Sequence, residues 1–326
     1  MTRAASTPEI VRYGELKPCK TAFIDAHTPG SNLKENFTII GGGVSESADQ
    51  HVHITTPHGF NIGAAGQPPK CRNSLHSHRT AEVFFVLSGR WRFFWGRRGD
   101  AGEVVLEPGD IINIPTGIFR GFENIGTDYG MIMAVLGGDD AGGGVIWAPQ
   151  VIEDAADHGL VLAETGKLYD TKAGQALPDG VAPMPVLTEA QMADYPELSP
   201  MQVVGWGVRR YWDMVALAQG APVTVIGETG IIRDRPGFEV ALMTRSSASM
   251  DHHAHDRPSV LMPVRGHWRV EWAGDAPGDA SLAPGDTASI PAGLPHAAYP
   301  SMEGEAALYH IVGTDDPAGP SALWSA

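Results

Sequence analysis

The sequence predicts an all-β protein built from two related domains, and three observations support this. Its 326 residues are too many for one typical domain and enough for two. Gly and Pro, with 40 and 25 copies, favour many short strands joined by turns over long helices. The third observation is an internal repeat, because the stretch HSHRTAEVFFVLSGRWRFFWG at 76–96 returns as HAHDRPSVLMPVRGHWRVEWAG at 253–274.

The repeat continues beyond this stretch. A shift of 177 residues aligns His76, His78 and Gly89 with His253, His255 and Gly266. Further along, a shift of 176 residues aligns Gly109, Pro115 and Gly117 with Gly285, Pro291 and Gly293. A drift of one residue is what a single deletion in a turn would leave, so we interpret the repeat as a true duplication.

Each copy predicts short strands separated by Gly or Pro turns. The apolar or alternating segments are 81–89, 91–95 and 110–115 in the first copy, and 259–266, 267–272 and 286–291 in the second.

The composition changes between the two copies. The segment 149–170 has the alanine content and spacing of one helix that is broken at Gly159, and 171–185 reads as a linker. We therefore expect an N-terminal domain at 1–150, a connector with a short helix at 151–195, and a C-terminal domain at 196–326.

Charge and composition exclude several classes of partner. A formal charge of -15 and a pI near 5.2 argue against nucleic acid, which needs a basic surface, and against anionic membranes. Apolar runs stay well below the length of about 18 residues that a membrane span requires, and the N-terminus lacks a signal-peptide core. The two cysteines, Cys19 and Cys71, form no metal or redox spacing. We expect a cytoplasmic protein that acts on a small molecule.

The repeated His-x-His pairs are the clearest chemical signal. In a strand, residues two apart point to the same face, so His76 and His78 project together, as do His253 and His255. Glu82, four residues beyond His78, keeps this parity if the strand continues. Each buried imidazole needs a partner, and a divalent metal satisfies two at once. The alternative is a set of structural histidines that hydrogen-bond inside the domain.

The two copies differ at two linked positions. A third metal ligand from a distant strand would be His296 in the second copy, where the first copy has Arg120. Conversely, Glu82 of the first copy is replaced by Ser259. The copy that keeps the carboxylate has therefore lost the third histidine, and the copy with three histidines has lost the carboxylate.

These residues resemble the double motif of the cupin superfamily, G-x5-H-x-H-x3-E-x6-G followed by G-x5-P-x-G-x2-H-x3-N. HSHRTAEVFFVLSG fits the histidine-to-glycine part of the first motif, and GDIINIPTGIFRGFEN fits the second except at Arg120. HAHDRPSVLMPVRG and GDTASIPAGLPHAAY keep all three histidines and depart at Ser259. The resemblance covers both β-domains and implies a bicupin, with two tandem double-stranded β-helix (jelly-roll) barrels and, by likeness to the superfamily, a homo-oligomer.

The resemblance also implies a metal site at His253, His255 and His296. It is similar to the three-histidine sites of gentisate- and quercetin-dioxygenase-like cupins, and it implies one divalent ion, with Fe(II) preferred over Mn, Ni or Zn. Three neutral imidazoles leave the ion its full charge and leave open positions for an anionic substrate and dioxygen.

The first copy leaves alternatives open. His76, His78 and Glu82 could form a second metal site of the two-histidine, one-carboxylate type. Arg120 opposes this, because a guanidinium cannot ligate a metal and stays protonated. We expect Arg120 to pair with Glu82; the alternative is that it binds a substrate carboxylate through two hydrogen bonds.

The expected function is that of a metal-dependent dioxygenase acting on a small oxygenated, aromatic or enolic acid. One rival is a cupin isomerase or decarboxylase that uses its metal as a Lewis acid, and another is a non-catalytic bicupin that binds a small molecule. No pairing of a nucleophile with a base stands out, so the sequence names no catalytic side chain.

Overall fold

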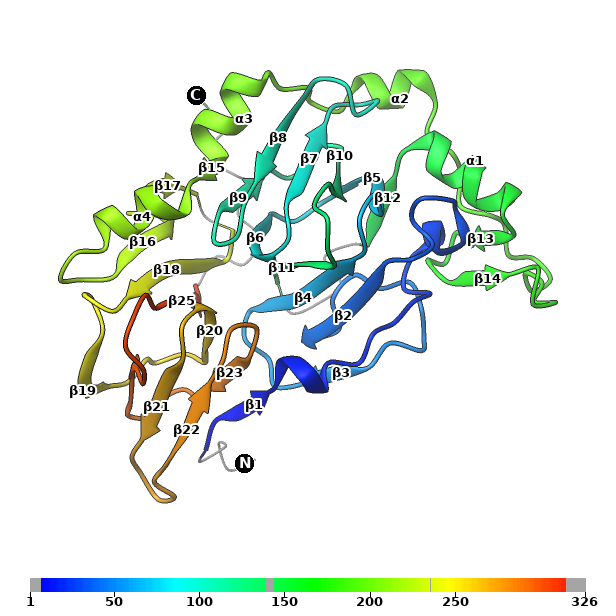
Figure 1. The fold of residues 1–326 in the computed structure, drawn as a ribbon. Helices are drawn as coiled ribbons and strands as arrows, with labels where there is room; N and C mark the ends of the chain where they lie inside the picture. Colours follow the sequence, from blue (N-terminus) through cyan, green and yellow to red (C-terminus); the bar gives the residue numbers. More distant parts are fainter. Residues whose placement is uncertain (1–6, 139–143, 235, 315–326) are drawn as a thin grey trace.

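The structure is a computed structural model that describes residues 7–138, 144–234 and 236–314. Among these residues, short strands dominate and only four short α-helices occur, as predicted for an all-β protein. The N-terminal half, blue through cyan to green in Figure 1, and the C-terminal half, yellow to red, each contribute most strands of one seven-stranded sheet and all strands of one smaller sheet. We refer to the two facing sheets of each half as its barrel.

The two large sheets have the same strand order. In the N-terminal barrel it is β15 (Val208–Arg209), β9 (Ile111–Ile114), β6 (Glu82–Ser88), β11 (Gly130–Gly137), β4 (Phe60–Gln67), β2 (Glu35–Ile40) and β3 (Val52–Ile54). In the C-terminal barrel it is β1 (Glu9–Val11), β23 (Thr287–Ile290), β20 (Ser259–Arg265), β25 (Ala307–Gly313), β18 (Phe238–Thr244), β16 (Val223–Gly227) and β17 (Ile232–Arg233). The duplication in the sequence is thus repeated strand by strand.

The smaller sheets correspond in the same way. The N-terminal one has the order β12 (Val145–Trp147), β5 (Arg72–His78), β10 (Arg120–Asn124), β7 (Trp91–Trp95) and β8 (Gly102–Leu106). The C-terminal one has the order β19 (Ser249–His253), β24 (His296–Pro300), β21 (Trp268–Trp272) and β22 (Gly278–Leu282). The six strands predicted from sequence are confirmed as β6, β7, β9, β20, β21 and β23.

The large sheets are buried on both faces. In β6, Phe84 and Val86 face the interior of their own barrel, whereas Val83 and Phe85 join a cluster that the two barrels share. Tyr309 of β25 belongs to the same shared cluster, with its ring centroid 4.7 Å from that of Phe85. Burial on both faces explains why β6 is continuously apolar instead of alternating.

One of the two edge strands of each large sheet comes from the other half of the chain. β15, which precedes the C-terminal barrel in sequence, pairs with β9 of the N-terminal barrel. β1, which precedes the N-terminal barrel, pairs with β23 of the C-terminal barrel. The domain limits at 150 and 196 stay a prediction. One strand from each side of these limits, β1 and β15, pairs with the sheet formed mainly by the other side.

We call the segments around β15 and β1 the two arms. Each arm is held by an aspartate in a turn of the barrel whose large sheet it joins. Arg210 donates to Oδ2 of Asp110 at 2.6 Å, and the backbone N–H of Tyr211 donates to Oδ1 at 2.8 Å. The Tyr211 ring lies against Gly109, whose φ is +91° and where a Cβ would sit 2.4 Å from the ring. Only glycine fits this turn.

The second arm repeats these contacts. Arg12 donates to Asp286 at 2.8 Å, the backbone N–H of Tyr13 donates to the same carboxylate at 2.9 Å, and the Tyr13 ring lies against Gly285. The same contacts, from an arginine, a backbone N–H and a tyrosine ring, therefore join the two halves at two places.

The four α-helices follow the N-terminal barrel in the chain. The helical segments are η1 (Tyr13–Glu15), η2 (Ile24–His27), α1 (Pro149–Asp157), α2 (Glu189–Ala193), α3 (Pro200–Gly207) and α4 (Tyr211–Leu217). Helix α3 packs against β8 and β9 of the N-terminal barrel, whereas α4 packs against β16 and β18 of the C-terminal barrel. The predicted helix is confirmed as α1, but beyond Gly159 the chain forms a hairpin, β13 (Leu160–Leu162) and β14 (Leu168–Asp170). No helix in the described ranges is long and apolar enough to cross a membrane.

Removing either aspartate should destabilise the fold. Asp110→Ala or Asp286→Ala should each lower the free energy of unfolding by about 1–3 kcal/mol, because a half-exposed arginine and a backbone N–H of the arm lose their buried acceptor. Glu103→Ala is the control, since its ion pair with Arg92 is exposed and should be worth less than about 1 kcal/mol. Denaturant unfolding measures the difference; aspartate variants no less stable than the control would refute the role of the arms.

Candidate metal sites

The first donor group is assembled from both sheets of the N-terminal barrel. His76 and His78 lie at the end of β5 and are 3% and 2% exposed. The strand ends at His78, and Glu82 begins β6 in the other sheet, so the parity argument for Glu82 is wrong. The turn between the strands nevertheless returns Glu82 to the histidines, and the ligand atoms of the three residues lie within 4.8 Å of one another.

The second donor group has the corresponding place in the C-terminal barrel. His253 ends β19, and its Cα pairs across the sheet with that of His296 in β24. His255 lies beyond the end of the strand, which corrects the prediction that both histidines share one strand. The ligand atoms of the three imidazoles lie within 4.8 Å of one another, with His253 exposed and His296 only 1% exposed.

Arg120 occupies the position that His296 has in the other barrel. Its Cα pairs with that of His76, as the Cα of His296 pairs with that of His253. The side chain is 1% exposed and forms the predicted ion pair with Glu82. The guanidinium also donates to the carbonyl oxygen of Ile118 at 3.3 Å.

The two histidines of the N-terminal barrel are neutral. Burial lowers the pKa of both His76 and His78 well below the ordinary value, and the charge of Arg120 lowers each pKa further. Nδ1 of His76 lies 2.7 Å from the carbonyl oxygen of Ser74, and Nδ1 of His78 lies 3.3 Å from that of Gly144. Both Nδ1 atoms therefore carry the proton and donate, which leaves the Nε2 lone pairs free.

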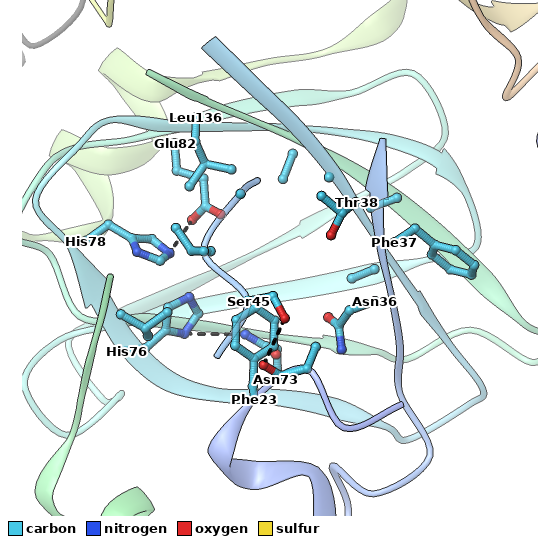
Figure 2. Close-up of a pocket in the computed structure, with 18 of the residues that line it drawn as sticks. Phe23, Asn36, Phe37, Thr38, Ser45, Asn73, His76, His78, Glu82 and Leu136 are labelled. Carbon is cyan, nitrogen blue, oxygen red and sulfur yellow. Dashed lines mark hydrogen bonds and ion pairs between the residues drawn. The ribbon is translucent and has the colours of Figure 1, made fainter. Parts of the chain in front are cut away.

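A cavity of about 80 Å³ opens beside this group, as Figure 2 shows. The labelled side chains of His76, His78 and Glu82 line one wall, while Phe23 and Phe37 contribute aromatic walls. Among the described residues that line the cavity, Arg120 is not included. Its charge is directed to Glu82, and binding of a substrate carboxylate by Arg120 stays a prediction.

Two of the three histidines of the C-terminal group have a ring nitrogen with no partner among the described residues. Nε2 of His255 and Nε2 of His296 are buried without a hydrogen-bond partner in the described part of the chain. Nδ1 of His296 lies 3.0 Å from the carbonyl oxygen of Leu294 and donates to it. Burial lowers the pKa of His296 to about 4 and also lowers that of His255, so both imidazoles are neutral at neutral pH.

A fourth histidine lies against this group and was missed from the sequence. His310, in β25, is 9% exposed, and its ring centroid lies 4.7 Å from that of His255. Burial lowers its pKa to about 3. The strand register places His310 where the first barrel has Ala134, outside either motif. A histidine in the otherwise apolar strand ALYHIVG was the available signal.

The C-terminal group fits a divalent ion better than the N-terminal group does. A buried imidazole nitrogen without a partner is costly, and in the C-terminal barrel two such atoms converge from separate segments. In that barrel one of the histidines has its Nδ1 held by a backbone carbonyl, the arrangement that orients Nε2 toward a metal. The N-terminal group has similar geometry, but a fixed guanidinium already neutralises its only carboxylate.

Comparisons with known proteins agree with this arrangement. A family model described as a cupin domain matches residues 66–136. Among solved structures, a deletion mutant of oxalate decarboxylase from Bacillus subtilis is 13% identical with a TM-score of 0.55, covering 97% of this chain and 78% of that one. The formate complex of oxalate decarboxylase from Lactobacillus farciminis is 11% identical with a TM-score of 0.56, covering 98% and 89%.

At such low identity, these structures bear on the fold alone. The comparison with curated proteins finds no match. The family model lies over β4 to β11, which carry the first donor group, and the solved structures span both barrels. The duplicated sheets, the two donor groups at corresponding places and these likenesses show that the chain has a bicupin fold, with a cupin domain matched at 66–136.

Proposed function

We propose that this bicupin is a metal-dependent enzyme that acts on a small carboxylate at His253, His255 and His296 of the C-terminal domain. The observation that carries the proposal is the pair of buried, partnerless Nε2 atoms that converge there on one point. In the other barrel, the guanidinium of Arg120 already neutralises the negative charge that Glu82 would otherwise offer to a metal.

The donor set determines what the site would bind. Three neutral imidazoles contribute no negative charge, so a divalent ion held there keeps its full charge and attracts an anion. An ion in this site would polarise a carboxylate oxygen as a Lewis acid. The residues of this chain bind the ion and orient it: His296 is fixed by Leu294, and the exposed His253 leaves the site open to solvent.

We also propose an identity for the ion. One of the similar structures has a title that names the Mn(II) centres of Bacillus subtilis oxalate decarboxylase. We therefore take Mn(II) as the first ion to test, ahead of the Fe(II) that the sequence resemblance implies.

For the reaction, we favour a decarboxylase or isomerase that consumes no dioxygen. The similar structures named above are oxalate decarboxylases by title, which supports the decarboxylase. The dioxygenase remains the second candidate, because Ser259 in place of a glutamate leaves the all-histidine donor set typical of cupin dioxygenases.

Metal content should depend on the C-terminal group. The purified wild type should hold one divalent ion per chain. His296→Ala should lose it, because a buried ligand is removed, whereas His76→Ala should retain it. Metal analysis of protein loaded with Mn(II) and dialysed gives the counts; metal that survives His296→Ala and is lost in His76→Ala would reverse the choice of barrel.

Arg120→His is the reciprocal variant. It removes the guanidinium and places an imidazole opposite His76, so the N-terminal barrel should gain a second ion and the count should rise to two per chain. A count that stays at one would mean that Arg120 is not what keeps the ion out.

Measuring oxygen uptake and carbon dioxide release distinguishes the two reactions. With oxalate and a panel of hydroxylated aromatic acids and diketones, a decarboxylase should release carbon dioxide without net uptake of oxygen. An oxygen electrode and a carbon dioxide assay on the same samples measure both. Uptake of one dioxygen per substrate consumed would replace the decarboxylase with the dioxygenase.

A further inference from the structure

His310 points into the C-terminal barrel beside the three-histidine group. Its strand β25 lies between β18 and β20, where the Cα of His310 pairs with those of Ala241 and Leu261. Leu308, two residues earlier, belongs to the barrel interior, whereas Tyr309 belongs to the cluster between the barrels. Alternation along the strand therefore directs His310 inward.

One ring nitrogen of His310 has no partner among the described residues. Its Nε2 is buried and forms no hydrogen bond with any residue that the structure describes. The ring contacts His255, with centroids 4.7 Å apart. His310 does not belong to the group whose ligand atoms lie within 4.8 Å of one another, so it stands next to the metal-type site and not within it.

Ser259 provides a second atom of the same kind. Its hydroxyl is buried, the residue is 1% exposed, and Oγ has no partner within the described ranges. Because Ser259 pairs with Val312 and Leu261 pairs with His310, Ser259 and His310 are diagonal neighbours on the inner face of one ladder.

The two barrels differ systematically at these positions. Where the N-terminal barrel has Glu82 and Ala134, the C-terminal barrel has Ser259 and His310. A carboxylate, which only accepts hydrogen bonds and repels an anion, is thus replaced by a hydroxyl and an imidazole, which can both donate. The change favours binding of an anion from solution, where the N-terminal barrel instead has the carboxylate of its own Glu82.

We infer that His310, together with the hydroxyl of Ser259, binds the carboxylate of the substrate at the three-histidine site and so selects for an anion. The inference rests on the proposed function and adds the two residues that contact the substrate. It accounts for two buried polar atoms that the metal ligands leave unexplained.

The test uses Mn(II)-loaded full-length protein and oxalate as the probe. The variants His310→Gln and His310→Leu have similar volumes, but only glutamine keeps an N–H donor. Both should retain one Mn(II) per chain. Oxalate binding, followed by water-proton relaxation of the bound Mn(II), should weaken ten-fold or more in His310→Leu and by less than three-fold in His310→Gln.

His267→Ala is the control, because this histidine is exposed and lies in the turn between β20 and β21. It should bind both Mn(II) and oxalate as the wild type does. Unchanged oxalate affinity in His310→Leu would overturn the inference, and loss of Mn(II) from either His310 variant would also overturn it by making His310 a ligand. Failure of the wild type to take up Mn(II) or Fe(II) would instead refute the proposed function.

Discussion

The reciprocal exchange of arms is the constraint on which the two-barrel structure depends. Each large sheet is completed by a strand from ahead of the other barrel, and each arm is anchored by an arginine and a backbone N–H on one turn aspartate, Asp110 or Asp286. The tyrosine rings that follow lie over Gly109 and Gly285, turns that admit no side chain. Because neither sheet is complete without the other half, the two barrels and the cluster between them form one structural unit.

Within this common frame, the two interiors have diverged by a small number of exchanges. Arg120 in place of His296 puts a permanent positive charge next to Glu82 in a buried site, and removal of either partner would leave the other charge unpaired. The opposite barrel contains no carboxylate at the matching position, and burial lowers the pKa of His296 to about 4, which keeps that imidazole neutral. One interior therefore pairs its charges internally, whereas the other leaves two buried nitrogens without a hydrogen-bond partner among the described residues.

Much of this could be predicted from sequence because it is periodic or repeated. The duplication, six strands, the helix from Pro149 and the two His-x-His pairs follow from spacing, and the cupin resemblance adds His296 to the second pair. Three features do not. Glu82 reaches its site through a turn between sheets, which strand parity cannot describe. The arms are an interaction between distant segments, visible in sequence only as the short likeness of Arg12-Tyr13 to Arg210-Tyr211. His310 belongs to no motif and becomes significant only when the ladder sets it beside His255.

The central claim is that the metal binds in the C-terminal barrel and not in the N-terminal one. Diffraction from crystals of the Mn(II)-loaded protein, recorded on both sides of the manganese absorption edge, tests it most directly. The account predicts one anomalous peak per chain, between His253, His255 and His296. A peak between His76, His78 and Glu82, with none in the C-terminal barrel, would contradict it.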